Sequence, residues 1–273
     1  MIKRCLVLLM GVFMMLGTTQ AEAARKVKPS KACKGTKWNK TRFSHKIFDR
    51  LLRKHVRRGK VNYNGFRRDR KKLNVYLCRL ARTRATRIRG FRNRFAFWIN
   101  AYNAVTIQAV LDRLPRSRGA QKRFSVAAKK HNFWKGWKYR VGKRWLTLDN
   151  IEHSILRPKY KDPRLHFAVV CASIGCPDLA NRAYTGRNLY RLMTRNTRRY
   201  LASSRGFRRG KGNTIGLSNL FNWFAGDFAR KPYKHRLLFV AKYAPKRYRR
   251  FLKRNHKSLK IKWLHYSWKL NVR

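Results

Sequence analysis

The segment FAFWINAYNAVTIQAVL, residues 95–111, contains no charged side chain and is apolar nearly all round a helical projection. An amphipathic surface helix has one polar face, so this segment predicts a helix that is buried on most sides and forms the centre of the fold. Asn100 and Asn103 lie three residues apart on one face of it, and buried amides must find hydrogen-bond partners. Pro115 is expected to close the segment, because a proline cannot continue a helix interior.

Apolar residues also recur at helical spacing on both sides of this segment. They predict amphipathic helices near residues 48–56, 73–80 and 189–201, a short helix over 151–156 that stops before Pro158, and a helix over 237–251 interrupted at Pro245.

Alternating patterns and short apolar runs predict the β-structure. They indicate a hairpin over 137–148, a buried strand over 165–171 and a terminal strand over 261–270. Gly175 and Pro177 impose a loop after the buried strand. We therefore expect an α+β fold: a single compact domain over residues 43–273, with several helices packed around a small, mostly antiparallel sheet.

The composition is unusual in the sign of its charge. The 273 residues include 71 Lys plus Arg and only 9 Asp plus Glu, which gives a net charge of +62. A disordered basic tail would be poor in aromatic residues, whereas this chain has 8 Trp, 12 Tyr and 16 Phe and can bury a core. The composition therefore indicates a folded protein with a strongly cationic surface.

The amino terminus, residues 1–23, has the pattern of a secretory signal peptide. Lys3 and Arg4 form its charged start, an apolar stretch follows, and Ala21-Glu22-Ala23 resembles a cleavage site. We predict an exported protein, secreted or periplasmic. An uncleaved membrane anchor is the alternative, but the apolar stretch falls short of the roughly 20 residues needed to span a bilayer. Residues 24–42 are Lys-rich without apolar periodicity and predict a basic N-terminal arm.

Four cysteines remain after residue 24: Cys33, Cys78, Cys171 and Cys176. In an oxidising compartment they permit two disulfides in any of three connectivities, and the sequence does not choose among these. For Cys33 and Cys78 a structural disulfide or an inert buried thiol is the favoured interpretation.

Several sequence blocks, taken in order, resemble a bacterial and plant family called domain of unknown function 547. The blocks lie within residues 45–271 and are Val61-Asn62-Tyr63, FWINAYNA (97–104), LDNIEH (148–153) with Leu156-Arg157, DPRLHFA (162–168), CASIGCP (171–177), Tyr184, Leu217-Ser218, Asp227-Phe228 and YSWKLN (266–271). The resemblance implies membership of that family more than any activity, because the biochemistry of the family is poorly defined.

This chain departs from the family pattern by losing acids. Asn62, Asn150 and Ser267 stand where the pattern has Asp. Five acids nevertheless remain within residues 149–227, and we regard them as candidates for buried pairing or chemistry: Asp149, Glu152, Asp162, Asp178 and Asp227. For Asp149 and Asp162 a helix cap and a turn residue are the simpler interpretations.

Cys171 is the predicted nucleophile, because it would end a buried strand beside a loop. His153 is the predicted base, since Glu152-His153 is the one adjacent pair of acid and imidazole. Glu152 cannot readily orient its neighbour on a helix, so we expect it to pair with Arg157 or Arg164. His166 would lie roughly 16 Å from Cys171 on the opposite face of the strand, which argues against that pairing.

Asn100 and Asn103 are the remaining candidates in the predicted site. One of them could orient the base or stabilise an oxyanion. The more economical interpretation is that both amides tie the central helix to neighbouring loop backbone.

Two further arrangements involve Cys171 and Cys176. With His153 and His166 they could hold a metal ion, although the C-x₄-C spacing is not diagnostic. A disulfide between the two would end the nucleophile hypothesis unless it were redox active. We predict neither a resident metal nor a cofactor.

The leading functional hypothesis is a thiol-dependent hydrolase or acyltransferase, papain-like or transglutaminase-like in chemistry and core arrangement. The alternative is a non-enzymatic envelope or interaction domain with structural cysteines. In both, the basic surface would bind polyanions non-specifically, whether nucleic acid, anionic lipid or lipopolysaccharide. A dedicated nucleic-acid function is the weakest hypothesis, because the cations are spread over the chain rather than clustered, although segment 134–140 interleaves them with aromatics.

Overall fold

The computed structural model describes residues 24–35 and 37–273, so the predicted signal peptide over residues 1–23 lies outside the described residues. The α-helices are α1 Lys46–His55, α2 Tyr63–Arg68, α3 Arg70–Arg82, α4 Phe91–Leu111, α5 Arg118–Arg123, α6 Arg157–Tyr160, α7 Leu189–Ala202, α8 Leu220–Trp223, α9 Ala225–Phe228, α10 Arg236–Tyr243 and α11 Lys246–Asn255. Short 3₁₀-helices are η1 Ala85–Arg87, η2 Lys129–His131 and η4 Pro163–Phe167, and η3 Asn150–Leu156 is a π-helix. The strands are β1 Arg25–Lys26, β2 Val56–Arg57, β3 Lys60–Val61, β4 Trp137–Val141, β5 Arg144–Leu146, β6 Phe207–Arg209, β7 Thr214–Ser218 and β8 Lys260–Leu264.

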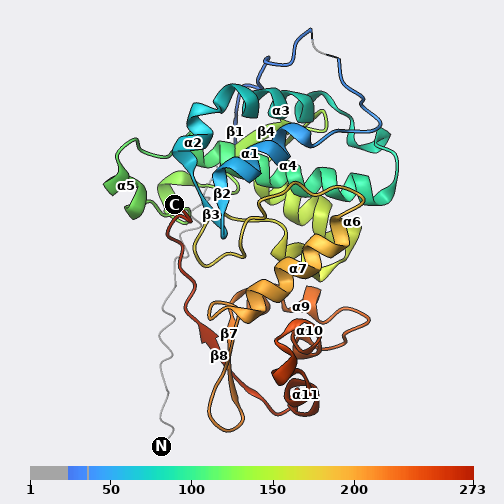
Figure 1. Ribbon diagram of the computed structural model, residues 1–273, viewed down its shortest axis with the longest axis vertical. Helices are drawn as coiled ribbons and strands as arrows, with labels where there is room; N and C mark the ends of the chain where they lie inside the picture. Colours follow the sequence, from blue (N-terminus) through green and yellow to red (C-terminus); the bar gives the residue numbers. More distant parts are fainter. Residues whose placement is uncertain (1–23, 36) are drawn as a thin grey trace, which may run out of the picture.

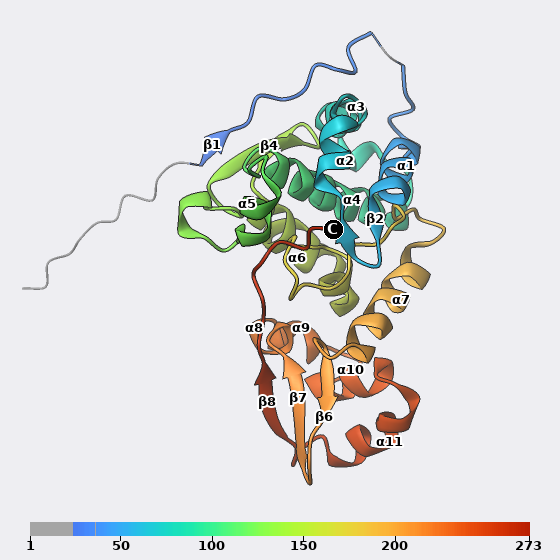
Figure 2. The same ribbon diagram turned by 60° about the vertical axis from the view of Figure 1, so that its left-hand side comes forward.

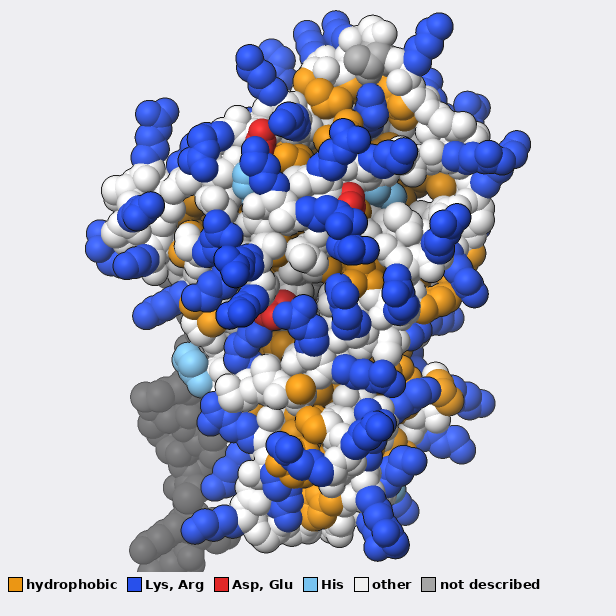
Figure 3. Space-filling view, in the orientation of Figure 1, with side chains coloured by type: hydrophobic (Ala, Val, Ile, Leu, Met, Phe, Trp, Pro, Cys, Tyr) orange, Lys and Arg blue, Asp and Glu red, His pale blue; other side chains and the backbone are white. Residues whose placement is uncertain are grey.

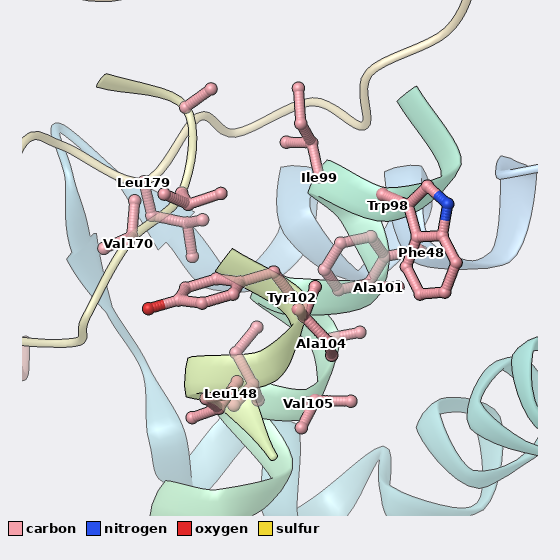
Figure 4. Close-up of a cluster of buried hydrophobic side chains, with 14 of the residues drawn as sticks. Phe48, Trp98, Ile99, Ala101, Tyr102, Ala104, Val105, Leu148, Val170 and Leu179 are labelled. Atoms are coloured by element: carbon pink, nitrogen blue, oxygen red, sulfur yellow. The ribbon is translucent and has the colours of Figure 1, made fainter. Parts of the chain in front are cut away.

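Helix α4 forms the centre of the larger core, as predicted. Its side chains from Phe95 to Ile107 are all buried. Figure 4 shows part of this cluster, in which Trp98, Ile99 and Val105 of α4 lie among side chains of other segments such as Phe48, Leu148, Val170 and Leu179. The α+β class is confirmed.

The two asparagines of α4 hold backbone groups of two distant segments. The Asn103 carboxamide donates to the carbonyl of Ala168 at 2.9 Å and accepts from the amide of Val170 at 3.0 Å. The Asn100 carboxamide makes the same pair of bonds to Tyr184, at 2.7 and 2.9 Å. Both side chains are almost completely buried. The interpretation that these amides tie the helix to loop backbone is therefore confirmed.

A second, smaller core lies on the other side of α7 from α1–α4, around α10, α11 and the sheet of β6, β7 and β8 (Figure 2). Its buried members include Phe167, Phe221 and Phe239. The chain then returns from β8 to the larger core, and its end lies beside β3 (Figure 1). The domain therefore has two apolar clusters joined by α7 and by the C-terminal segment.

The β-structure forms three small sheets rather than the one sheet that we predicted. Their orders are β1-β4-β5, β2-β3 and β6-β7-β8. The β4–β5 hairpin is confirmed, and its turn residues Gly142 and Lys143 have φ of 62° and 66°, as a type I′ turn requires. The sheets stay separate because β4 and β5 belong to the larger core, whereas β7 and β8 cover the smaller one.

Two predicted boundaries were wrong. The helix over 151–156 does not stop before Pro158 but runs as η3 directly into α6, whose second residue is Pro158. The terminal strand ends at Leu264 instead of residue 270. Beyond it the chain pairs through isolated bridges, with Ser125 and Ser173 at Lys269 and Leu270 and with β3 at Val272.

The basic arm over residues 24–42 is attached to the domain by strand β1, by a disulfide and by hydrogen bonds of Trp38 with Thr83 and of Thr41 with Arg89. Strand β1 pairs in parallel with β4. Cys33 is buried and forms a disulfide with Cys78 of α3, which confirms the structural interpretation of this pair.

Lys and Arg side chains are spread over the face drawn in Figure 3, with few acids among them. Each of the eight acids in residues 24–35 and 37–273 has a nitrogen of Lys, Arg or His within 4.0 Å: Asp49, Asp69, Asp112, Asp149, Glu152, Asp162, Asp178 and Asp227. The retained acids are thus all used in pairing. Among the described helices, none is long and apolar enough to cross a membrane.

We expect Asn103→Ala to lower the free energy of unfolding by about 2–4 kcal/mol, because it leaves the Ala168 carbonyl and the Val170 amide buried without partners. Urea unfolding followed by circular dichroism measures the change. Thr106→Val is the matched control on the same helix, since the buried Thr106 hydroxyl has no hydrogen-bond partner, and it should be neutral or stabilising. Equal losses in the two variants would contradict the proposed role of the amide.

Candidate functional site

A cavity of about 510 Å³ lies where the two cores meet. Cys171 and Trp268 line it, and both side chains pack against the larger and the smaller apolar cluster. The other residues that line the cavity are Tyr102, Val126, Ala127, Ala128, Lys129, Asn132, Phe133, Trp134, Lys135, Asp149, Glu152, His153, His166, Val169, Cys176, Leu220, Trp223, Phe224 and Tyr266. The predicted residues Cys171, His153 and Glu152 therefore share one cavity, although Cys171 is separated in sequence from the adjacent pair Glu152-His153.

Aromatic rings form one wall of this cavity. Tyr266 and Trp268 of the C-terminal segment lie with ring centroids 4.7 Å apart, and the Trp223 ring of α8 lies 4.9 and 5.5 Å from them. Trp134 meets Trp268 edge-on at 5.6 Å. This wall can accept a flat or apolar group.

The segment that carries Cys171 is a loop and not the end of a strand, so the predicted strand over 165–171 was wrong. Residues Pro163–Phe167 form the 3₁₀-helix η4, and the Asp162 carboxylate caps it by accepting from the amide of Arg164. The apolar run is buried on all sides by helices and loops, and its backbone is fixed by Asn103 instead of by a neighbouring strand. His166 therefore reaches the same cavity as Cys171, contrary to our expectation.

The C-terminal segment fixes the cysteine loop from the outside. The amides of Ile174 and Gly175 donate to the carbonyls of Lys269 and Ser267, each at 2.8 Å, and the amide of Asn271 donates to the carbonyl of Ala172 at 2.9 Å. A Cβ at Gly175 would lie only 2.7 Å from the Tyr266 ring, so only glycine lets this ring lie against the loop.

Between the two cysteines the backbone turns sharply. Ala172 has φ of 65°, a left-handed conformation that costs a non-glycine residue about 1–2 kcal/mol. This turn returns the chain so that the Cys171 amide donates to the Cys176 sulfur at 3.0 Å. Both thiols are free.

Three hydrogen-bond donors surround the Cys171 sulfur. Burial raises the pKa of Cys171, but the Cys176 thiol, the Ser173 hydroxyl at 3.1 Å and the Tyr266 hydroxyl at 3.4 Å outweigh it and lower the pKa to about 7. Burial raises the pKa of Cys176 well above its usual value, and the adjacent Cys171 adds to this. The partly exposed Cys171 is therefore the more acidic thiol of the pair.

Arg157 sets the tautomer of His153, the predicted base. Arg157 donates to its Nδ1 at 2.6 Å, and a guanidinium can only donate, so the ring proton must be on Nε2. Nε2 lies 3.9 Å from the Asp149 carboxylate. Asp149 makes no capping hydrogen bond, so its interpretation as a helix cap was also wrong.

His166 is held by two carboxylates. Its Nε2 donates to Asp227 at 2.8 Å, and its Nδ1 lies 4.0 Å from Glu152. Arg157 and Arg230 also bind Asp227, at 2.6 and 2.9 Å. Burial opposes ionisation of Asp227, but the bonds from His166 and Arg157 prevail and lower its pKa well below the usual range.

The expected partners of Glu152 were wrong. Arg157 binds Asp227 and His153, and Arg164 binds Asp162 at 2.6 Å. Glu152 instead faces His166 and acts on the hydroxyl of Tyr102, whose pKa is raised well above its usual value by burial and then by this carboxylate. Glu152 thus presents its carboxylate to the cavity.

Asn100 and Asn103 do not line the cavity. Each carboxamide binds a backbone carbonyl and a backbone amide instead. Their contribution to the site is to fix the loop that carries Cys171. Within residues 24–35 and 37–273, no group of three or more His, Cys, Asp or Glu side chains is arranged to hold a metal ion.

Sequence reasoning missed several residues of the site. Tyr266 and Trp268 lie in a sequence block that we had noted only for its family resemblance, and that block could have pointed to them. Ser173 lies in the cysteine block in the same way. Trp223 and Phe224 carry no such signal, because only the packing of α8 brings them to the cavity.

Residues 91–201 match the family described as "Protein of unknown function, DUF547". This match confirms the family predicted from the sequence, and it extends from α4 to α7 across both cysteines. No curated protein and no solved structure matches the chain. The papain-like or transglutaminase-like core arrangement therefore stays a prediction.

We expect the alkylation rate of Cys171 by iodoacetamide to rise with pH to a midpoint near 7, because the thiolate is the reactive form. Peptide mass spectrometry resolves this thiol from Cys176. Tyr266→Phe keeps the ring but removes a donor, and it should move the midpoint toward about 8.5, the value of an ordinary thiol. A wild-type midpoint already near 8.5 would show that the donors do not activate Cys171.

Proposed function

We propose that this member of the DUF547 family is an exported thiol-dependent hydrolase or acyltransferase in which Cys171 is the nucleophile. The observation that carries the proposal is the setting of the Cys171 sulfur, which is partly exposed in the wall of a cavity of about 510 Å³ and has a pKa lowered to about 7. A thiolate at neutral pH needs no separate base to remove its proton.

The cavity also offers groups for the steps that follow attack. The Cys171 sulfur would bond to the acyl carbon of a substrate, and the leaving group would take a proton. That proton would come from water, and the Nε2–H of His153, which lines the cavity, can donate a hydrogen bond to the leaving group. Water or another acceptor would then release the acyl group, and the Glu152 carboxylate is placed to receive the acceptor's proton.

The aromatic wall bears on the class of substrate. Trp223, Tyr266 and Trp268 present contiguous rings beside the thiol. Two cations, Lys129 and Lys135, also line the cavity, from the segment before β4. Such a cavity favours an acyl group that is flat or apolar over a small polar one.

We expect 4-nitrophenyl acetate to acylate Cys171, giving an acetyl adduct on that residue in intact-mass and peptide spectra. Cys171→Ala should lower the rate of nitrophenol release by at least about 100-fold. Ile174→Ala, which alters an exposed side chain of the same loop outside the cavity, should leave the rate unchanged. Equal rates for wild type and Cys171→Ala would exclude a nucleophilic role.

The disulfide between Cys33 and Cys78 supports export, because such bonds persist in oxidising compartments. The same disulfide also supports the alternative hypothesis, an envelope or interaction domain, because this pair of cysteines is structural. A second observation favours polyanions as partners: a cleft of about 430 Å³ is lined by six cations, Arg53, Lys54, Arg57, Arg58, Arg199 and Arg273. Polyanion binding is compatible with either function.

We expect the affinity for duplex DNA, measured by fluorescence anisotropy, to fall by about 10³-fold or more between 50 and 200 mM salt and to ignore base sequence. Arg57→Glu with Arg58→Glu should weaken binding more than Lys211→Glu with Lys257→Glu, an equal change of charge at exposed positions away from the cleft. A clear sequence preference would favour a dedicated nucleic-acid function instead.

A further inference from the structure

The two free cysteines are placed like the two that are bonded. In the Cys33–Cys78 disulfide, the amide of the first cysteine lies 3.2 Å from the sulfur of the second. In the free pair the amide of Cys171 lies 3.0 Å from the sulfur of Cys176. The second sulfur thus approaches the first cysteine equally closely in both pairs, and the side chains of Cys171 and Cys176 are already within hydrogen-bonding reach of each other.

The two thiols are unequal in access. Cys171 is partly exposed in the wall of the cavity, whereas the side chain of Cys176 is buried. The donors around Cys171 favour its thiolate, and burial keeps Cys176 protonated. An accessible nucleophilic thiol beside a buried second thiol is the arrangement that thiol–disulfide exchange needs, since one sulfur attacks and the other resolves.

Side chains at and after the end of α7 hold the cysteine loop in this arrangement. Arg205 donates to the carbonyls of Ile174 and Cys176 at 2.7 and 2.8 Å, and Tyr200 donates to that of Gly175 at 2.8 Å. Together with the left-handed Ala172, these bonds keep the two cysteines of the C-x₄-C segment side by side. A disulfide between them would therefore require movement of side chains more than of backbone.

We propose that Cys171 and Cys176 form a dithiol–disulfide pair that exchanges with a substrate disulfide bound in the aromatic cavity. This activity goes beyond acyl transfer and does not depend on it, although both would use Cys171.

The exchange balances in two steps. The Cys171 thiolate attacks one sulfur of R–S–S–R′; a bond forms between Cys171 and S–R, the substrate S–S bond breaks, and R′–S⁻ leaves and takes a proton. Cys176 then loses its proton to the departing R–S⁻ and attacks the Cys171 sulfur. The protein dithiol is oxidised by two electrons to the Cys171–Cys176 disulfide, and the substrate disulfide is reduced to two thiols.

The test is reaction of the full chain, with Cys171 and Cys176 as free thiols and the Cys33–Cys78 disulfide intact, with oxidised glutathione, followed by acid quench, alkylation with N-ethylmaleimide and peptide mass spectrometry. Wild type should end as the Cys171–Cys176 disulfide with only a transient glutathione adduct. A stable adduct on Cys171 with Cys176 still free, or no reaction of Cys171 while free N-acetylcysteine reacts fully, would overturn the proposal. The Cys33–Cys78 disulfide is an internal control, because both of its side chains are fully buried and it should stay intact.

Two variants separate the roles of the thiols. Cys176→Ser should accumulate the glutathione adduct on Cys171, because the resolving thiol is gone. Cys171→Ser should react at least tenfold more slowly than wild type, because the remaining thiol is buried. The wild-type result decides the proposal even if either variant is poorly folded, and thermal melting identifies that case.

This result is distinguishable from the acylation result. A chain that forms the Cys171–Cys176 disulfide but gives no acetyl adduct with 4-nitrophenyl acetate supports exchange and overturns the hydrolase or acyltransferase proposal. A chain that is acetylated on Cys171 but retains a stable glutathione adduct does the reverse.

Discussion

The two hydrogen bonds between the Asn103 carboxamide and the backbone of Ala168 and Val170 are the constraint on which the site depends. They join the most buried helix to the segment that leads into Cys171. In a strand, a neighbouring strand would satisfy these backbone groups; here a side chain does so, which lets the chain leave regular structure and turn at Ala172. Asn100 does the same at Tyr184, so that α4 fixes both ends of the loop between η4 and α7.

The C-terminal segment is the second element that fixes the cysteine loop. It pairs with the cysteine loop through Lys269 and Ser267 and brings the rings of Tyr266 and Trp268 to the cavity. Its other side pairs with the start of the domain, where Tyr63 donates to the Asn271 side chain at 2.8 Å in a buried contact. Residues more than 200 positions apart thereby meet around one site, and the two apolar cores are held together at the place where the thiols lie.

The low pKa of Cys171 comes from hydrogen-bond donors around its sulfur and not from an imidazole base. The Nδ1 of His153 accepts a hydrogen bond from Arg157, and the Nε2 of His166 donates one to Asp227. These arginine and acid side chains fix the orientation of both rings. The sulfur of Cys171 is activated by two hydroxyls and a second thiol. In a chain with so many cations, the few acids hold particular nitrogens in place, and five of the eight described acids lie in residues 149–227.

The sequence by itself determined the buried helix α4, the hairpin, most of the amphipathic helices and the family, because each of these is encoded by local periodicity or by contiguous blocks. It also named Cys171, Glu152 and His153, which do share the cavity. Only the tertiary structure decided that residues 165–171 form no strand, that His166 reaches the cavity and that His153 presents a hydrogen instead of a lone pair. The physical reason is that Asn103, Arg157, Asp227 and Tyr266 act on these groups from distant parts of the chain, and no local pattern records which side chain will satisfy a buried backbone amide or orient a ring.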